Sequence, residues 1–427
     1  MSTVVMKFGG TSVGDAGKIR AAARRAMRAR RRGHRVVVVV SAMGDTTDHL
    51  VDLAHQLHPS PPKREYDQLL ATGEQVTISL MAMALEQMGA PAISFTAGQI
   101  GMVTDDVHTK ARIKRIDVAR IRRELRAGKI VIVAGFQGVT ESGAVTTLGR
   151  GGSNVTLVAI AASLGADVCE NYTDVDGIYT ADPRIVPNAR KIERISYDEM
   201  LELASLGASV LHNRAVEFAK KYRVPIHVRG TGTERKGTMI VGETGEMERI
   251  VVSGAALKKQ LARITLRNVP DRPGVAAKIF HVLAAASIVV DDIIQTETTP
   301  KLATVSFTVD LPDLPDARRV CRRLCATLAG MAATFEDDLA KVSVVGVGMR
   351  VHTGVADRMF AALAKGRINI QNITTSEIKI SCIIDRAEGP KALRLVHDAF
   401  ELGRKPRAAR RAVKKAATRR PARTSKR

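Results

Sequence analysis

The sequence lacks tryptophan, and phenylalanine and tyrosine together make up only 3% of it. So few aromatic rings argue against a stacking platform for single-stranded nucleic acid, and they leave the cores to valine, isoleucine, leucine and alanine. No apolar stretch reaches the roughly 20 residues that cross a bilayer, and the strand-like start MSTVVMKFGG leaves no room for a signal peptide. We therefore expect a cytoplasmic protein without membrane association.

Cysteine is also scarce. The four cysteines are too few and too unevenly spaced for a disulfide framework: Cys169, Cys321, Cys325 and Cys382. The Cys321/Cys325 pair has no second Cys or His pair at zinc-site spacing. A reducing compartment is the simplest interpretation, and the sequence predicts no set of metal ligands.

Acidic residues are outnumbered, because 66 Lys and Arg stand against 43 Asp and Glu, which gives a formal net charge of +23. Twelve of the cations lie in residues 403–427, which contain no acid, so the rest of the chain carries only +11. This tail has no apolar periodicity and is expected to be disordered. Two interpretations remain open: a solvated tail, or a weak and salt-sensitive contact with nucleic acid or another anionic surface.

Short β-branched runs alternate with longer helix-compatible segments over residues 1–245, which predicts an α/β fold. The predicted strands are Thr3–Lys7, Val36–Val40, Ala92–Phe95, Ile130–Ala134, Asp167–Tyr172 and Pro225–Val228. The predicted helices are Ala16–Arg32, Tyr66–Gln87, Asn154–Leu164 and Tyr197–Tyr222. All-apolar strands suit a mostly parallel sheet that is covered by helices on both faces.

Residues beyond about 245 contain an internal duplication. When Gly274–Ala276 is aligned with Gly354–Ala356, apolar positions of the following helix and strand also coincide. Each copy predicts a strand, a helix and further strands: Arg263–Arg267, Val275–Ala285, Ile288–Ile294 and Thr304–Val309, then Lys341–Val347, Val355–Ala364, Ile368–Ile373 and Ile378–Ile383. We expect two small α+β modules.

The first candidate for chemistry is Lys7–Ser12, which follows a predicted strand and precedes a helix. Gly9 and Gly10 allow backbone N–H groups to approach an anion, and Lys7 adds a full positive charge. The pattern suits a phosphate. A glycine pair after a strand also forms plain turns, and the Walker spacing is absent.

Two later segments are also rich in chemical groups. In Thr146–Asn154, three glycines surround Arg150 just before a helix, which suits a guanidinium held against a planar carboxylate. A flexible surface loop is the alternative, but it would not favour so many glycines at a helix start. Tyr172–Arg184 packs three carboxylates, an arginine and two tyrosines after a strand. It is not a calcium loop, because the bidentate Glu at the twelfth position is missing.

These motifs belong to an ordered set that resembles the aspartate kinases of the amino acid kinase family. The set comprises KFGGTSVGD (7–15), SAMGDTTD (41–48), LLATGEQVTISLMA (69–82), TTLGRGGSN (146–154), YTDVDGIYTADPR (172–184) and ISYDEMLELASLGASVLHNRAVEFAKKY (195–222). The duplicated part resembles paired ACT domains in DRPGVAAKIF (271–280) and KVSVVGVGMRVHTGVADRMF (341–360). The resemblance implies an amino acid kinase domain over 1–245, ferredoxin-like ACT domains over 246–330 and 331–402, with an exchange of strands left open, and a basic tail over 403–427.

By resemblance, the reaction transfers the γ-phosphoryl group of MgATP to the β-carboxylate of L-aspartate, giving 4-phospho-L-aspartate, the entry to lysine, threonine and methionine synthesis. A carboxylate nucleophile is ionised at neutral pH, so catalysis needs in-line placement and charge neutralisation rather than a general base. Mg²⁺ is expected to bridge phosphate oxygens with few protein ligands. The resemblance assigns catalysis to Lys7, Arg150 and Asn154; ATP binding to Lys7, Phe8, Gly9, Gly10, Gly152, Thr173, Asp174, Tyr179, Arg184, Ser209 and Val210; and aspartate binding to Ser41, Thr47, Glu74 and Arg150.

The ACT pair implies feedback regulation by lysine or threonine, bound where one ACT copy meets another. By the same analogy we expect a homodimer or a larger homo-oligomer assembled through these modules. The implied effector contacts are Asp271, Arg272, Pro273, Gly274, Val275, Asp292, Gln295, Thr353, Gly354, Asn372, Thr375, Ser376 and Glu377.

Three positions depart from the family pattern. Asn154 stands where the family usually has Asp after RGGS, Asp45 where Lys commonly follows SAMG, and Ser209 where a Lys often touches ATP. Loss of the carboxylate at position 154 costs about 1–3 kcal/mol of charge pairing in a desolvated site. The departures leave a second hypothesis open: an amino-acid-sensing regulatory homologue whose kinase site is impaired.

Overall fold

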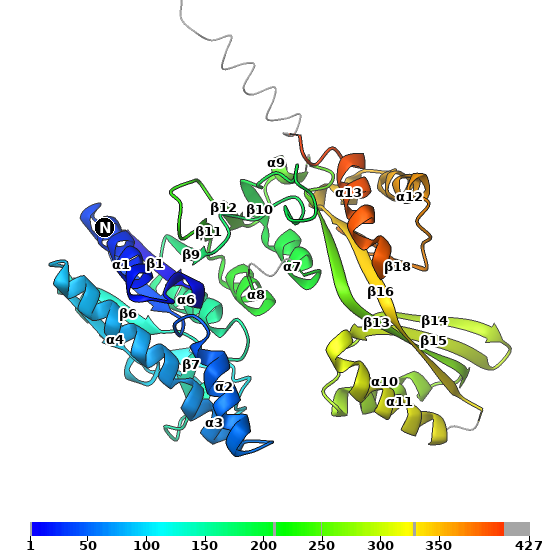
Figure 1. Cartoon of the computed structure of the whole chain (residues 1–427), viewed down its shortest axis with the longest axis horizontal. Helices are drawn as coiled ribbons and strands as arrows, with labels where there is room; N and C mark the ends of the chain where they lie inside the picture. Colours follow the sequence, from blue (N-terminus) through cyan, green and yellow to red (C-terminus); the bar gives the residue numbers. More distant parts are fainter. Residues whose placement is uncertain (1, 208–210, 249, 328–329, 405–427) are drawn as a thin grey trace, which may run out of the picture. The chain divides into compact units, whose positions relative to one another are not determined.

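The computed structural model describes residues 2–207, 211–248, 250–327 and 330–404. The chain divides into two compact units (Figure 1). The first comprises residues up to Tyr179 together with Lys191–Met247, and the second comprises Thr180–Arg190 and the residues from Glu248 onward. Ser209, Val210 and residues 405–427 of the basic tail lie outside the described residues.

The first unit is built on an eight-stranded sheet with the strand order β10-β12-β11-β9-β1-β2-β6-β3. All neighbouring strands are parallel except β11 and β12. The strands are β1 (Thr3–Phe8), β2 (Arg35–Val40), β3 (Ala92–Phe95), β6 (Ile130–Ala134), β9 (Val168–Thr173), β10 (Arg194–Ser196), β11 (Ile226–Gly230) and β12 (Thr238–Val241). A four-stranded sheet of order β5-β4-β7-β8 contains β4 (Met102–Thr104), β5 (Ile113–Ile116), β7 (Gln137–Val139) and β8 (Val145–Thr147).

Helices cover both faces of the large sheet, which confirms the predicted α/β architecture. On one face, α1 (Ala16–Arg31) and α4 (Thr72–Gln87) share a hydrophobic core with alternate residues of β1, β2 and β6. α6 (Gly152–Leu164) packs against β1, β2 and β9 and is buried continuously from Gly152 to Ala161, as expected of a helix that is apolar all round. The other helices are α2 (Thr46–Leu57), α3 (Lys63–Leu70), α5 (Ala119–Arg126), α7 (Tyr197–Ser205), α8 (Asn213–Tyr222) and α9 (Gly245–Glu248).

Two predicted helices are each interrupted, so their prediction as single helices is wrong. The segment predicted as Tyr66–Gln87 ends as α3 at Leu70 and resumes as α4 at Thr72. The segment predicted as Tyr197–Tyr222 ends as α7 at Ser205, and Gly207 has a φ of +100°, a left-handed conformation that stops a helix. α8 then begins with His212 as its N-cap, whose ring nitrogen accepts a hydrogen bond from the Arg214 N–H.

The second unit contains one antiparallel sheet of six strands in the order β14-β15-β13-β16-β18-β17. Its strands are β13 (Gly254–Pro270), β14 (Asp291–Thr299), β15 (Leu302–Asp310), β16 (Ala332–Val345), β17 (Asn372–Thr375) and β18 (Lys379–Asp385). Its helices are α10 (Val275–Ala285), α11 (Leu314–Thr327), α12 (Val355–Lys365) and α13 (Gly389–Ala399). The two predicted α+β modules are therefore present and share one sheet.

The long strands β13 and β16 run through both modules (Figure 1). Residues 261–267 of β13 pair with 332–339 of β16 in the first module, whereas residues 254–258 pair with 341–345 in the second. The core of the second module accordingly contains Val252 and Ala255 together with Val342 and Val344. The second module thus takes a strand from the segment that precedes the first module, which is an exchange of the kind that the sequence leaves open.

Residues Thr180–Arg190 include the end of the candidate segment Tyr172–Arg184 but belong to the second unit. Ala181 and Val186 are buried in the core of the second module, and the Thr180 hydroxyl lies 3.0 Å from Nε2 of His397. The predicted domain 1–245 is therefore interrupted by a short segment that packs with the second unit.

All four cysteines are free. In the parts of the chain that the structure describes, no helix has the length and apolar character needed to span a membrane. The described residues also contain no group of three or more His, Cys, Asp or Glu side chains that is placed to hold a metal ion.

Candidate active site

The carboxyl ends of the parallel strands β1, β2, β6 and β9 meet at one edge of the large sheet, the usual position of a binding site in this architecture. The glycine turn after β1 contacts the turn after β2, because the Gly44 N–H donates to the carbonyl of Gly10 at 3.0 Å. A Cβ added at Gly10 would lie 3.0 Å from the carbonyl oxygens of both Ala42 and Gly44. The second glycine is therefore required by close approach of the two backbones.

The start of α6, which follows the second glycine-rich turn, reaches the same edge. The hydroxyl of Ser41 donates to that of Ser153 at 3.0 Å. A Cβ added at Gly135, after β6, would lie 2.7 Å from the same Ser153 oxygen. The two glycine-rich turns thus meet through the residues that follow β2.

Lys7 is the cation at this edge. It is only 8% exposed, and burial lowers its pKa to about 8, although the nearby Asp174 carboxylate acts in the opposite direction. A Cβ at Gly9 would lie 3.2 Å from the Lys7 ammonium, so the missing side chain leaves the ammonium room beside the turn. Lys7 is in register with Asn171 of β9, and residues paired in this way project from the same face of a sheet.

Buried polar atoms without partners gather along this edge. Glu74 accepts a 3.0 Å hydrogen bond from the Ala42 N–H through Oε1, but its Oε2 is unpaired, and burial raises the pKa of this carboxyl to about 8. Oδ1 of Asn154 and both amide atoms of Asn171 are likewise buried and have no partner among the described residues. Buried polar groups are normally satisfied, so these atoms suit a polar ligand.

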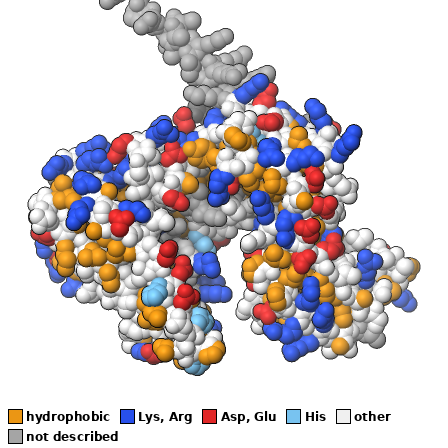
Figure 2. Space-filling model, in the orientation of Figure 1, with side chains coloured by type: hydrophobic (Ala, Val, Ile, Leu, Met, Phe, Trp, Pro, Cys, Tyr) orange, Lys and Arg blue, Asp and Glu red, His pale blue; other side chains and the backbone are white. Residues whose placement is uncertain are grey.

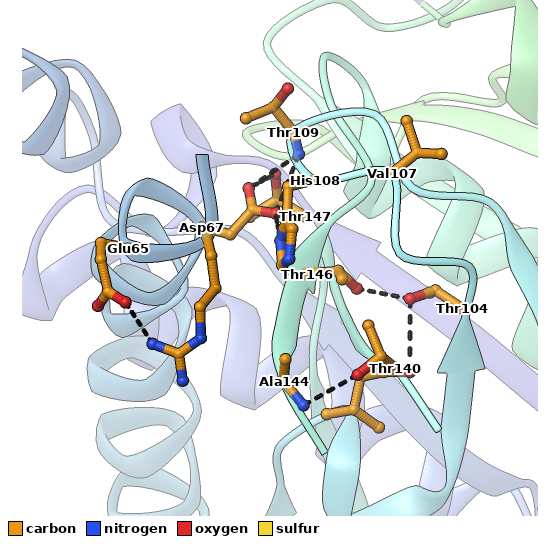
Figure 3. A network of polar contacts seen from close by, with 12 residues as sticks. Glu65, Asp67, Thr104, Val107, His108, Thr109, Thr140, Ala144, Thr146 and Thr147 are labelled. Carbon is orange, nitrogen blue, oxygen red and sulfur yellow. Dashed lines mark hydrogen bonds and ion pairs between the residues drawn. The ribbon is translucent and has the colours of Figure 1, made fainter. Parts of the chain in front are cut away.

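Asp67 of α3 anchors the approach to the second glycine-rich turn (Figure 3). This carboxylate is fully buried and accepts hydrogen bonds from the Thr147 hydroxyl at 2.6 Å and from the Thr109 N–H at 2.9 Å. It also lies 2.8 Å from Nδ1 of His108. Thr146 forms a buried 2.7 Å hydroxyl pair with Thr104. The two threonines that open the TTLGRGGSN motif are therefore structural anchors.

Arg150 lies in the turn itself, between Gly149 and Gly151, which have φ values of +76° and +71°. A Cβ at Gly149 would lie 2.9 Å from the carbonyl oxygen of Thr109, so the loop held by Asp67 sets the position of this turn. Arg150 is exposed and forms no hydrogen bond or ion pair with any residue that the structure describes. Its guanidinium is available to a carboxylate ligand.

The nucleotide-binding residues predicted after β9 are divided between the units. The Thr173 hydroxyl donates to Asp174 at 2.9 Å. The Tyr179 hydroxyl donates to Asp176 at 2.6 Å, and this bond, with burial, raises the pKa of Tyr179 to about 12. Arg184 lies in the second unit, where its guanidinium donates hydrogen bonds to both carboxylate oxygens of Asp182.

Phe8 does not present its side chain to the site. Its ring is buried and stacks on Tyr172 with 4.8 Å between ring centroids, within the core on the α1 face. The reason is strand alternation, because Phe8 and Lys7 project from opposite faces of β1. The predicted contact of Phe8 with ATP would therefore have to come from its backbone. Thr47 lies in the first turn of α2 and is half-buried.

The predicted effector residues lie in four places in the second unit: Asp271–Val275 at the start of α10, Asp292 and Gln295 on β14, Thr353 and Gly354 at the start of α12, and Asn372, Thr375, Ser376 and Glu377 on or after β17. The Gln295 amide donates to Asp271 at 3.2 Å, so these two residues meet. Asp292 also forms an ion pair within the second unit. Its carboxylate is 4% exposed and lies 2.6 Å from the ammonium of the buried Lys341, and it accepts from Thr374 of the second module.

Sequence reasoning missed Asp67, Ser153 and Asn171. A single Asp on an amphipathic helix carries no signal of the segments that it will join. Ser153 lies inside a recognised motif, but only the fold brings it to Ser41. A polar Asn in the β-rich run VCENYT was the one available signal, since a buried strand of a parallel sheet is usually apolar.

Comparison with known proteins agrees with this geometry. The model of the amino acid kinase family matches residues 2–230, and two ACT domain models match residues 264–327 and 342–400. An aspartate kinase from Stutzerimonas stutzeri is 50% identical over 403 residues, covering 94% of this chain and 98% of that protein. Aspartokinase 2 from Bacillus subtilis is 50% identical over 408 residues, covering 96% of this chain and all of that protein.

Solved structures give the same result. The structure of E. coli aspartokinase III in complex with aspartate and ADP is similar with a TM-score of 0.79 at 25% identity, covering 93% of this chain and 99% of that one. The same enzyme in complex with lysine and aspartate has a TM-score of 0.75 at 26% identity. The chain therefore belongs to the amino acid kinase family, carries two C-terminal ACT domains, and groups within that family with the aspartate kinases. The predicted class, an ATP-dependent phosphotransferase, is confirmed.

Proposed function

We propose that the protein catalyses transfer of the γ-phosphoryl group of ATP to the β-carboxylate of L-aspartate, giving 4-phospho-L-aspartate, and that the active site lies at this edge of the large sheet. The observation that carries this proposal is the meeting of the Lys7 turn and the α6 start at Ser41 and Ala42. One turn supplies an ammonium for phosphates, and the other supplies a guanidinium for a carboxylate. The complex of E. coli aspartokinase III with aspartate and ADP supports both ligands.

Lys7 neutralises charge on the transferring phosphoryl group, and the backbone of Gly9, Gly10 and Gly152 lines the phosphates. Thr173 and Asp174 hold the nucleotide beside Lys7, which is close enough to Asp174 for the carboxylate to affect its pKa. Mg²⁺, when bound with ATP, screens the phosphate charges. Because the described residues hold no cluster of acidic ligands, the ion would be carried mainly by phosphate oxygens.

Arg150 binds a carboxylate of aspartate through its free guanidinium, and Ser41 contacts the substrate from the turn after β2. Glu74 supplies the negative charge for the substrate ammonium, because its Oε2 is buried and unpaired while position 154 carries a neutral amide. The buried carboxyl is mostly protonated at pH 7 in the free enzyme, since its pKa is about 8. Binding of the ammonium therefore requires the release of that proton.

A hydroxylamine-trapping assay with MgATP and aspartate tests the proposal. We expect turnover by the full chain and a loss of about 100-fold or more in kcat for Lys7→Met, because a preorganised charge at the transferring group is removed. Lys18→Met, at an exposed lysine paired with Asp15 on α1, is the matched control. Background turnover by the unmodified chain would instead support the regulatory homologue with an impaired kinase site.

We further propose feedback control by lysine or threonine at the ACT modules and assembly through them. The lysine complex of E. coli aspartokinase III supports an amino-acid effector. Ala181 and Val186 are buried in the second module, and the chain continues directly from Tyr179, a proposed ATP-binding residue, into this segment. This continuity supports transmission of effector binding from the second module to the ATP site. Inhibition assays with each amino acid, and mass measurement by light scattering, test these two statements.

A further inference from the structure

A second hollow lies in the first unit, between α1 and the loop that follows β11. It has a volume of about 470 Å³ and is lined mainly by four arginines of α1 and by residues 231–234. This volume lies within the range of small-molecule sites. None of the residues assigned above to ATP, aspartate or an effector lines it.

The arginines of the hollow follow from the pattern of α1. Arg24, Arg28 and Arg31 are spaced four and three residues apart, so they share one face of the helix, while the apolar residues of α1 face the core. In Figure 2, Lys and Arg side chains gather over the part of the molecule where Figure 1 draws α1. The hollow is therefore flanked by concentrated positive charge.

Arg25 lines the hollow and is held in place by hydrogen bonds to the loop. It is only 8% exposed, and its Nη2 donates to the carbonyl oxygens of Thr231 and Thr233, both at 3.0 Å. Its guanidinium also lies 4.7 Å from the centroid of the Tyr172 ring. These contacts fix the loop against the helix, so the arrangement is built before any ligand arrives.

Glu234 shows how the arginines hold an oxyanion. Its Oε1 lies 2.7 Å from Nη2 of Arg28 and 3.4 Å from Nη2 of Arg25, yet its side chain is 64% exposed. It is the only acidic residue in the lining, and Arg24 and Arg31 form no ion pair within the described residues. One carboxylate therefore faces four guanidinium groups.

We propose that this hollow binds a small anion carrying two or more phosphate groups, which takes the place of the Glu234 carboxylate on Arg28 and recruits Arg24 and Arg31. The planar donor fork of arginine matches phosphate oxygens, and the excess of cations over one carboxylate requires a multiply charged partner. A neighbouring cavity of about 80 Å³ shares Arg25, Arg28 and Glu234 and adds Arg32 and the Arg229–Glu170 ion pair. The inference is independent of the phosphoryl transfer proposed above.

Isothermal titration calorimetry of the full chain with inorganic pyrophosphate tests the proposal, with the ATP site saturated by a non-hydrolysable ATP analogue. We expect one pyrophosphate per chain, and binding weakened about tenfold or more by Arg24→Ser/Arg31→Ser. Arg20→Ser/Arg35→Ser removes the same charge from exposed positions outside the lining and should leave the affinity within about twofold, because these charges are screened. Aspartate kinase activity of both variants should match the parent, which verifies their folding.

Glu234→Gln gives a test of opposite sign. Loss of the competing carboxylate should tighten pyrophosphate binding about threefold or more, and orthophosphate should bind more weakly than pyrophosphate to every variant. The proposal is overturned if pyrophosphate does not bind beside the ATP analogue, or if the two double variants lose affinity equally. Weaker binding to Glu234→Gln, or equal affinity for the two phosphates, would also overturn it.

Discussion

The Thr147 hydroxyl donates a 2.6 Å hydrogen bond to Oδ1 of Asp67, a buried carboxylate 80 residues earlier in the chain. The same carboxylate binds the Thr109 N–H, and the carbonyl of Thr109 lies against Gly149. Asp67 therefore fixes the position of the turn that contains Arg150. Its effect on Arg150 is thus transmitted through Thr109 and Thr147.

Asp67→Asn should raise the KM for aspartate about tenfold with a smaller change in kcat, because the turn loses its charge-assisted anchor and Arg150 is displaced. Thr147→Val should produce a smaller effect in the same direction, and the double variant should be less than additive because the two residues share one bond. Glu65→Gln is the control, since this exposed residue of α3 pairs only with Arg64 among the described residues. Equal effects on the KM for ATP and the KM for aspartate would contradict the assignment.

Aspartate binding should release up to one proton near pH 7. The free Glu74 carboxyl has a pKa of about 8, so it is mostly neutral at pH 7, and an ammonium placed beside it lowers that pKa. The affinity for aspartate should accordingly rise as the pH is raised from 6 toward 8. Calorimetry in buffers of different ionisation enthalpy measures the released proton, and Glu74→Gln should abolish both effects. A release that persists in Glu74→Gln would assign the proton to another group.

Asn154→Asp should lower the KM for aspartate by about 5- to 150-fold, since a carboxylate at this buried and unpaired position adds about 1–3 kcal/mol of charge pairing with the ammonium. Steady-state kinetics with aspartate and ATP varied separately isolates the effect. Asn154→Ala serves as the comparison, because it removes the amide without adding charge. An unchanged or higher KM in Asn154→Asp would mean that the site is built around the amide.

Val186→Ala should weaken the response to the inhibiting amino acid. The variant loosens Thr180–Arg190 within the second module at a cost of about 1–2 kcal/mol, and we expect the half-inhibitory concentration to rise about threefold or more while uninhibited turnover is retained. Val309→Ala, at an equally buried position in the first module, is the matched control. Similar increases in the half-inhibitory concentration for both variants would show that general destabilisation of the ACT modules is responsible.

Lys341→Met should destabilise the second unit by about 3–5 kcal/mol, because it leaves Asp291 and Asp292 without the ammonium that both contact. Urea unfolding followed by circular dichroism measures the change. Adding Asp292→Asn to Lys341→Met should recover part of the loss, since one unpaired carboxylate is then removed. No recovery would indicate that Lys341 stabilises the unit through packing alone.

Local patterns carried most of what the sequence could predict. Lys7, Gly9 and Gly10 are neighbours in the chain, so the sequence alone could place an ammonium beside a glycine turn at the end of a strand, and the structure has this arrangement. The burial of the Phe8 side chain also follows from strand alternation, because Phe8 projects from the face of β1 opposite to Lys7. Gly207 could similarly have signalled the break between α7 and α8.

Features that depend on distant pairing were out of reach. Asp67 joins His108, Thr109 and Thr147 only after three segments fold together. The ion pair of Asp292 depends on Lys341, nearly fifty residues away. No periodicity in one segment reports the identity of its partner, so such contacts require the tertiary structure.

The path of β13 limits how the regulatory half of this chain can be cut from the rest. A fragment that starts at residue 259 would contain every helix of both ACT modules, but it would leave residues 341–345 without the neighbour that 254–258 provide. The exposed edge would invite pairing with other chains. Any independently expressed regulatory polypeptide must therefore begin upstream of Gly254.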